Sequence, residues 1–131
     1  MEETCSDGIL VLVDAANVMG SRPDGWWRDR VGAVTRLLAE LQAWAVRHPG
    51  DVIVIVEGVV CAGIDEGVHG GVEVRHALRS GVDAADDLIV ELVRAASHRE
   101  VEVVTADREL RHRVGALGAQ VAGPQALFGR L

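Results

Sequence analysis

Two runs of consecutive apolar residues constrain the fold of this 131-residue chain more than any other feature. Residues 8–13 (GILVLV) lead into Asp14, and residues 51–56 (DVIVIV), apolar from Val52 onwards, lead into Glu57. A strand with one face in water alternates apolar and polar residues, whereas a run without alternation predicts a strand covered on both faces. Strands of that kind belong to parallel sheets between helices, so the runs predict an α/β fold.

The rest of the chain supplies helices and further strands. Apolar residues at intervals of three and four predict helices at 26–46, 83–96 and 107–114, with a last helical turn that Pro124 opens. Shorter apolar segments predict strands at 72–76, 101–105 and 119–122. The stretch 58–71 is rich in glycine and is predicted to be a loop.

These elements fit one domain, because a chain of this length commonly forms a single core. We predict a domain over residues 8–131 and a flexible N-terminus over residues 1–7. The domain is expected to have three layers, with a central, mainly parallel sheet of about five strands between helices.

Composition excludes several classes of α/β protein. All 13 basic residues are arginine, because the sequence has no lysine. A P-loop, a Schiff-base enzyme and a receiver domain with a lysine beside its acceptor aspartate are thereby excluded. The longest uncharged run, residues 114–129, is too short to span a membrane, and the N-terminus is acidic where a secretory signal is basic. Two cysteines, Cys5 and Cys61, make no disulfide framework, so we expect a cytoplasmic protein.

Acidic residues stand where the predicted strands end. They are Asp14, Glu57 and Asp107 after the first, second and fourth strands, and Asp83, Asp86 and Asp87 in the helix after the third. An isolated aspartate at such a position is most often a helix cap. Because parallel strands bring their carboxyl ends to one edge, however, this whole group is expected to converge there. Clustered carboxylates need a proton or a cation, and oxygen ligands suit Mg²⁺ or Mn²⁺, which activate water for phosphodiester hydrolysis.

Four segments also carry a family resemblance. They are LVLVDAAN at 10–17, VIVEG at 54–58, DAADDLI at 83–89 and VVTADREL at 103–110. In this order they resemble the motifs of the NYN branch of PIN-domain nucleases, and most closely those of the bacterial YacP-like group. The likeness extends from Gly8 to Phe128, and it implies a PIN-like fold with metal-dependent endoribonuclease activity.

The resemblance also implies roles for individual residues. Asp14, Asp86 and Asp107 match the metal-binding acids of the family, which implies Mg²⁺ or Mn²⁺ as the cofactor. Asn17 matches the polar residue that helps to position metal or phosphate. Thr105 matches a hydroxyl that supports the site by hydrogen bonding.

The sequence departs from the family pattern in places. Glu57 replaces the aspartate that YacP-like chains usually have after the second strand. We therefore expect it to support the metal ligands without binding the metal itself. Of the three helix acids, Asp86 lies at the edge of the apolar stripe and is preferred as the ligand, Asp87 comes second, and Asp83 is interpreted as a cap. Glu40 could imitate the second acid of toxin-type PIN domains, but an ordinary solvated helix residue is the preferred interpretation.

The expected partner is single-stranded RNA, although the net charge of −7 offers no general attraction to it. Arginines follow the first and fourth predicted strands, and two tryptophans, Trp26 and Trp27, lie among the arginines that follow the first strand. The candidate RNA-binding residues are Arg22, Arg28, Arg108, Arg111 and Trp26. Arginines paired on solvated helix faces, and a tryptophan that packs at the start of the first helix, are the structural alternatives.

The leading hypothesis is an endoribonuclease in RNA processing or mRNA decay, acting on free RNA or on mRNA presented by the ribosome. A toxin RNase with a protein antitoxin is the first alternative. A non-catalytic module that binds RNA or a protein partner, with acids that only cap helices, is the second. A homodimer is compatible with each hypothesis.

Overall fold

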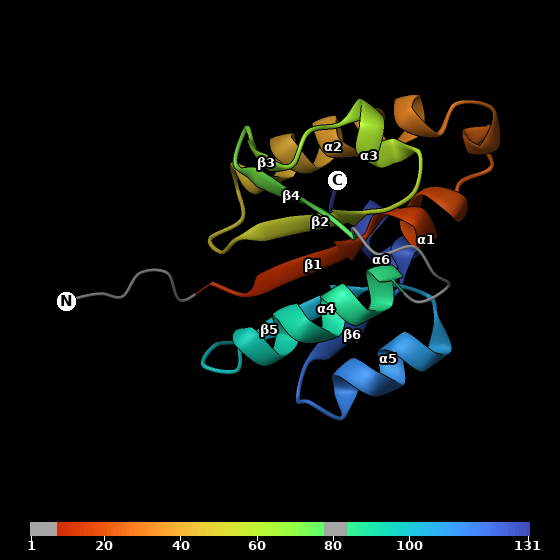
Figure 1. The fold of residues 1–131 in the computed structure, drawn as a ribbon. Helices are drawn as coiled ribbons and strands as arrows, with labels where there is room; N and C mark the ends of the chain where they lie inside the picture. The colour runs from red at the N-terminus through yellow and green to blue at the C-terminus, as the bar shows by residue number, and fades with distance from the viewer. Residues whose placement is uncertain (1–7, 78–83) are drawn as a thin grey trace.

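The structure, a computed structural model, describes residues 8–77 and 84–131. Six strands form one sheet in the order β3-β4-β2-β1-β5-β6 (Figure 1). Every neighbouring pair is parallel except β3 and β4. The strands are β1 (Leu10–Asp14), β2 (Val52–Val56), β3 (Gly67–His69), β4 (Val72–His76), β5 (Val101–Val104) and β6 (Gln120–Ala122).

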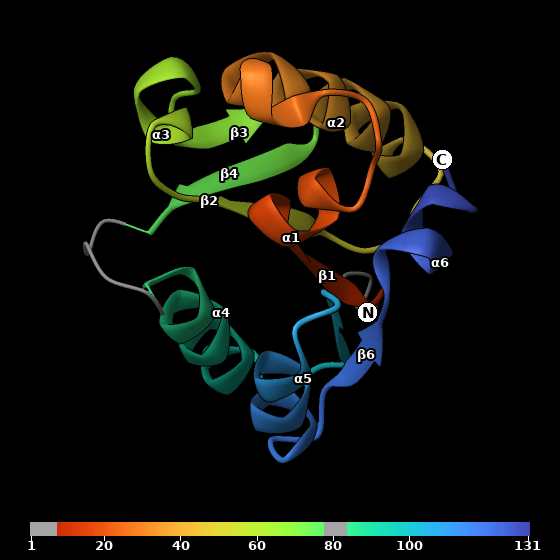
Figure 2. The ribbon, with the colours of Figure 1, turned by 90° about the vertical axis from the view of Figure 1, so that its right-hand side faces the viewer.

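Helices cover both faces of this sheet, which confirms the predicted three-layer α/β class. One face carries α1, α2, α3 and α6, and the other carries α4 and α5 (Figure 2). Among the described residues, no helix is both long and apolar enough to pass through a membrane. The helices are α1 (Ala15–Gly20), the 3-10 turn η2 (Trp26–Arg28), α2 (Arg30–Ala45), α3 (Val60–Gly63), α4 (Ala84–Ala95), α5 (Arg108–Gly115) and α6 (Pro124–Phe128).

The unbroken apolar runs are explained by two separate cores. Val11 and Val13 of β1 join the cluster under α1 and α2, while Leu10 and Leu12 join the cluster under α4 and α5. Successive side chains of a strand point to opposite faces, so a strand between two helical layers needs apolar residues at every position. All five residues of β1 are buried, Asp14 included.

The prediction of one helix over 26–46 was wrong at its start. Trp26–Arg28 forms a 3-10 turn, and Asp29, with φ −152°, separates it from α2. The Asp29 carboxylate then caps α2 by accepting a hydrogen bond from the Gly32 N–H at 2.9 Å. The short helix α1, which begins directly after Asp14, was not predicted, because six residues are too few to show an amphipathic period.

The prediction of a loop over residues 58–71 was also wrong. This stretch contains α3 and the short strand β3, which makes the sheet six-stranded. Gly70 and Gly71, with φ of 57° and 86°, form the turn of the β3–β4 hairpin. Consecutive positive φ values are the requirement of a tight hairpin turn, so the Gly-Gly pair was the available signal.

Two predictions fall outside the described residues. They concern residues 1–7, predicted as a flexible N-terminus, and Asp83, predicted as the cap of the third helix.

Candidate active site

The site begins with the central strand of the sheet. β1 lies between β2 and β5, and the chain passes to the other face of the sheet after β4, so β1 marks the point where the winding changes direction. Side chains at the carboxyl ends of strands beside such a point face a crevice. Asp14 is the last residue of β1, and Thr105 follows the last residue of the adjacent β5.

A buried hydroxyl joins two of the predicted acids. Thr105 Oγ1 donates a hydrogen bond to Asp14 Oδ2 at 3.0 Å and accepts one from the Asp107 N–H at 3.1 Å. Thr105 is fully buried, and Asp14 is only 4% exposed. The hydroxyl therefore fixes the backbone of Asp107 relative to the carboxylate of Asp14.

Asn17 adds a second link across the same edge. Its side-chain Oδ1 accepts a hydrogen bond from the Ala106 N–H at 2.7 Å. Its own N–H lies 3.5 Å from Asp14 Oδ1, which caps α1. The first turn of α1 is thus attached to the segment between β5 and α5. The side-chain amide of Asn17 contacts the backbone of this segment.

Asp14 and Asp107 both begin helices, as the capping alternative expected. Asp107 Oδ1 accepts a hydrogen bond from the Leu110 N–H at 2.9 Å at the start of α5. Each carboxylate retains further lone pairs, because a carboxylate offers about four acceptor positions. Capping and ligation are therefore compatible for these two residues.

The electrostatics of the edge show that its carboxylates repel one another. Burial raises the pKa of Asp14 to about 6, the hydrogen bonds from Thr105 and Asn17 oppose this, and the charges of Glu57 and Asp107 add to it. The pKa of Glu57 is raised by burial and then by the charge of Asp86. Glu57 is thus electrostatically coupled to Asp14 on one side and to Asp86 on α4 on the other.

The donor chemistry fits a hard divalent cation, in an open arrangement. Asp14, Asp107, Glu57 and Asp86 offer only oxygen ligands, which Mg²⁺ and Mn²⁺ prefer. Within residues 8–77 and 84–131, no three acidic, histidine or cysteine side chains come close enough together to hold one ion. Mg²⁺ commonly takes one or two protein carboxylates and keeps several waters. The edge is therefore compatible with an ion on one or two of these carboxylates, and it forms no closed cage.

Comparison with solved structures finds the same architecture. Two crystal structures of Rae1 (YacP) from Bacillus subtilis, one of them a W164L mutant, match with a TM-score of 0.74 and 20% sequence identity. The matches cover 92% and 91% of this chain and 72% and 71% of the other. The chain has the YacP fold. No protein-family model and no curated protein matches the sequence.

The resemblance to the YacP-like group, inferred from four short motifs, is therefore confirmed at the level of the fold. In this chain the YacP fold brings Asp14, Asn17, Thr105 and Asp107 into one hydrogen-bonded unit. Glu57 interacts electrostatically with Asp14 of that unit, and Asp86 interacts electrostatically with Glu57.

Two of the predicted residues are engaged elsewhere. Asp87 Oδ1 accepts a hydrogen bond from Arg113 of α5 at 3.1 Å, so this carboxylate joins α4 to α5. Arg22 pairs with Glu40 at 2.7 Å, and its guanidinium lies 4.1 Å from the centre of the Phe128 ring. Glu40, considered above as the second acid of a toxin-type site, is thus held by an arginine.

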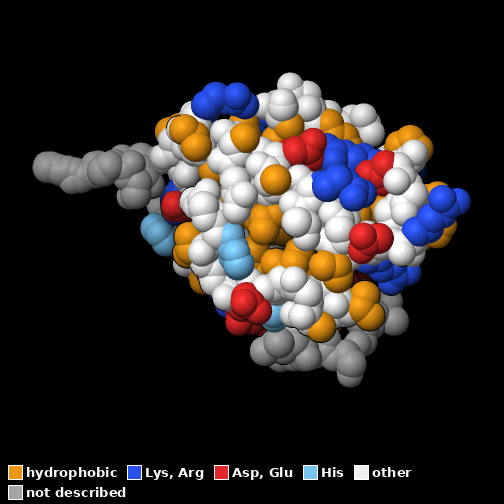
Figure 3. Space-filling view, turned by 90° about the horizontal axis from the view of Figure 1, so that it is seen from above, with side chains coloured by type: hydrophobic (Ala, Val, Ile, Leu, Met, Phe, Trp, Pro, Cys, Tyr) orange, Lys and Arg blue, Asp and Glu red, His pale blue; other side chains and the backbone are white. Residues whose placement is uncertain are grey.

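The face that carries α2 and α3 shows arginine and acidic side chains next to one another (Figure 3). Arg36 and Asp24, 3.7 Å apart, form a further pair beside Arg22 and Glu40. Exposed pairs of this kind contribute little stability. They do neutralise arginines that would otherwise attract phosphate.

The other candidate RNA-binding residues lie at the surface. Arg28 is exposed, with its guanidinium 5.7 Å from the centre of the Trp27 ring. Arg108 is exposed and Arg111 half-buried in the first turn of α5, directly after Asp107. Trp26 packs against the core beneath α2, as the structural alternative expected, and one side of it lines a pocket.

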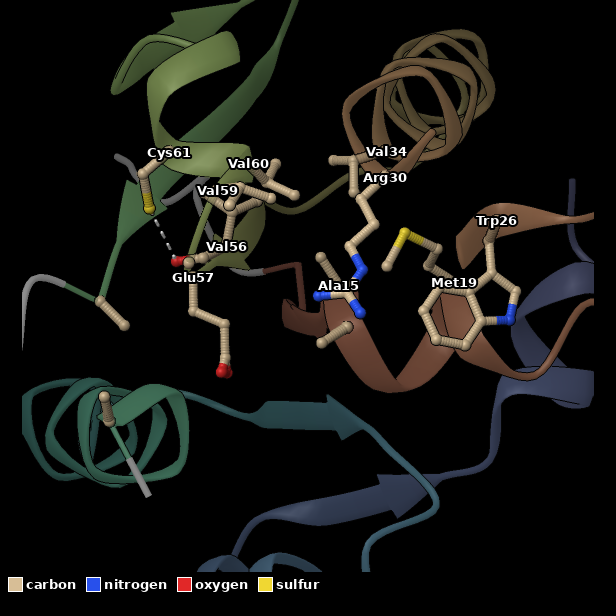
Figure 4. Close-up of a pocket in the computed structure, with 14 residues that line it drawn as sticks. Ala15, Met19, Trp26, Arg30, Val34, Val56, Glu57, Val59, Val60 and Cys61 are labelled. Atoms are coloured by element: carbon tan, nitrogen blue, oxygen red, sulfur yellow. Dashed lines mark hydrogen bonds between the residues drawn. The ribbon is translucent and has the colours of Figure 1, made fainter. Parts of the chain in front are cut away.

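This pocket is the feature that sequence reasoning missed. It has a volume of about 680 Å³ and lies between α1, η2, the start of α2 and the segment after β2 (Figure 4). Arg30 and Glu57 are its charged lining residues. Its walls come from elements far apart in sequence, two of which were not predicted, so no local pattern could have revealed it.

The raised pKa of Asp14 predicts how stability changes with pH in metal-free protein. Between pH 4 and 6 the folded state holds this proton more tightly than the unfolded state, whose Asp pKa is near 3.8. The buried charge should therefore cost nothing below this window and up to about 3 kcal/mol above it. Denaturant titrations of wild-type protein and Asp14→Asn should diverge as pH rises from 4 to 6, with the variant the more stable. A difference that does not change with pH would contradict the assignment.

Proposed function

We propose that this chain is a metal-dependent endoribonuclease of the YacP-like NYN group, and that it hydrolyses single-stranded RNA. The observation that carries the proposal is the buried Asp14 at the carboxyl end of the central strand. Its pKa is raised to about 6, and a shared hydroxyl links it to the backbone of Asp107. A protein gains no stability from burying such a carboxylate, which favours a functional role.

The proposed roles follow from the contacts. Asp14 and Asp107 hold Mg²⁺ or Mn²⁺, with Asp86 as a further ligand. Glu57 adds a negative charge next to these ligands without binding the metal. Thr105 keeps the carboxylate of Asp14 in one orientation. When bound, the metal supplies an activated water and offsets the charge of the scissile phosphate. The protein therefore needs no side-chain nucleophile.

RNA is held by arginines of the segments around this edge. Arg108 and Arg111 lie in the first turn of α5, which begins after Asp107, and Arg28 lies in the turn before α2. The acidic edge itself accounts for part of the net charge of −7, and this part is neutralised when metal binds. The proposed substrates include mRNA presented by the ribosome, in which a single-stranded segment would reach this edge.

The test is metal-dependent cleavage of an unstructured, end-labelled RNA. We expect cleavage with Mn²⁺ or Mg²⁺ and none with excess EDTA, because in the proposed mechanism the bound metal supplies the activated water. Calorimetric titration with Mn²⁺ should give saturable binding that Asp107→Asn weakens by about 10–100-fold.

Two outcomes would separate the alternatives. Cleavage that persists undiminished in EDTA would refute the metal mechanism. Absence of both cleavage and Mn²⁺ binding, with translating ribosomes present as well as absent, would favour a non-catalytic binding module.

A further inference from the structure

The pocket between α1 and α2 has the shape and chemistry of a binding site. Its volume of about 680 Å³ lies within the usual range for small-molecule pockets, roughly 300–1,000 Å³. Met19, Val34 and Val60 form an apolar wall, and each of them is buried. Trp26, which is half-buried, adds an aromatic surface at one end.

The pocket opens beside the acidic edge. Ala15 and Ala16 of α1 line it, and they directly follow Asp14. Glu57 belongs to both places, because it lines the pocket and comes two residues after Ile55, which pairs with Asp14 in the sheet. Figure 4 shows its side chain extending from the end of β2 towards α4. The pocket and the acidic edge are thus joined through Glu57 and the first turn of α1.

Arg30 gives the pocket a cation. Its side chain extends from α2 towards α1, beside Met19 and Trp26 (Figure 4). The guanidinium lies 5.6 Å from the centre of the Trp26 ring. No acidic side chain of the described residues forms an ion pair with it, in contrast to Arg22 and Arg36. In a protein of charge −7, an arginine left available beside an apolar pocket favours a ligand with an anionic group and a flat apolar body.

We propose that the pocket is a nucleotide subsite, which takes the base of an unpaired residue next to the scissile phosphate. The base stacks on Trp26 and the apolar wall, while Arg30 contacts the adjoining phosphate. Stacking of this kind accepts any base, because every base has a π face. The inference rests on the proposed function for its position along RNA, but binding of a nucleotide does not depend on cleavage.

Two variants test the subsite without disturbing the core. Ala16→Phe places a ring in the pocket from an exposed position of α1, and Arg30→Met removes the charge while keeping the apolar stem. The matched controls are Ala39→Phe, at an exposed position of α2 outside the pocket, and Arg36→Met.

The measurement is tryptophan fluorescence during titration with adenosine 5′-monophosphate in EDTA. We expect saturable quenching by the nucleotide and none by ribose 5-phosphate, which has no base to stack. Ala16→Phe should weaken nucleotide binding by about tenfold or more. Arg30→Met should weaken it several-fold, and both controls should bind as wild type.

The outcomes distinguish this inference from the proposed function. If RNA is cleaved but the nucleotide does not quench, or if Ala16→Phe leaves quenching unchanged, the subsite is refuted and the nuclease proposal stands. If nucleotide binds as expected but no RNA is cleaved under any condition, the nuclease proposal fails and the subsite stands. Equal quenching by ribose 5-phosphate would refute base stacking.

Discussion

Asp14→Asn is expected to lower kcat/KM for RNA cleavage by about 100-fold or more, the usual scale for loss of one preorganised electrostatic group. The variant removes the negative charge from the most buried carboxylate of the edge and changes little else. Asparagine has nearly the same shape, and its one oxygen can still accept the hydrogen bond from Thr105, while the longer contact with the Asn17 N–H, at 3.5 Å, is lost. The lost activity would therefore report the charge and not the packing.

A stable but inactive variant is the expected signature. Since the folded variant no longer buries a negative charge at position 14, the melting temperature of metal-free Asp14→Asn should exceed that of wild type at pH 7. Asp51→Asn serves as the control, because Asp51 is exposed, precedes β2 at the opposite end of the sheet and pairs with Arg99. Wild-type cleavage by Asp14→Asn, or loss of activity equal to that of the control, would exclude Asp14 as a ligand.

Thr105→Val is the second large expected effect. It should destabilise the protein by about 1–3 kcal/mol, since the Asp107 N–H would lose its hydrogen-bond acceptor beside the buried Asp14. Valine fills the same volume, so the loss would come from the hydroxyl and not from a cavity.

The same substitution should reduce cleavage and metal affinity by about 10–100-fold, because the carboxylate of Asp14 would lose the partner that orients it. Thr105→Ser restores the hydroxyl and should recover most of the metal affinity. If serine and valine give the same Mn²⁺ affinity by calorimetry, Thr105 acts only in packing.

The pH profile gives a separate reading of this contact. The Thr105 hydrogen bond lowers the pKa of Asp14 against the larger effect of burial. Removing the donor should therefore move the acid limb of the activity profile to higher pH, whereas Thr105→Ser should leave it in place.

The layered fold was predictable because two strands, β1 and β2, have apolar side chains on both faces. Val11 and Val13 face one helical layer, and Leu10 and Leu12 face the other, so the run has no polar interruption before Asp14. Short elements left weaker signals. α1 and α3 have six and four residues, fewer than two helical turns, and no periodicity can be read from them.

The acids of the site were predictable for the same topological reason. Parallel strands deliver the residues after them to one edge, which brought Asp14 beside Thr105 and near Asp107. The partners of charged residues were not predictable. Asp87 with Arg113, and Arg22 with Glu40, are joined only by the packing of segments that are separate in sequence, and sequence spacing does not encode that packing.

The two outermost strands of the sheet also determine how copies of this chain can associate. Both edge strands, β3 and β6, have only three residues, and β3 runs antiparallel to its neighbour. A strand this short offers few backbone groups to a strand from another molecule, which is a common protection against edge-to-edge growth. A dimer of this protein would therefore be built from helical surfaces, and its sheets would remain two separate sheets.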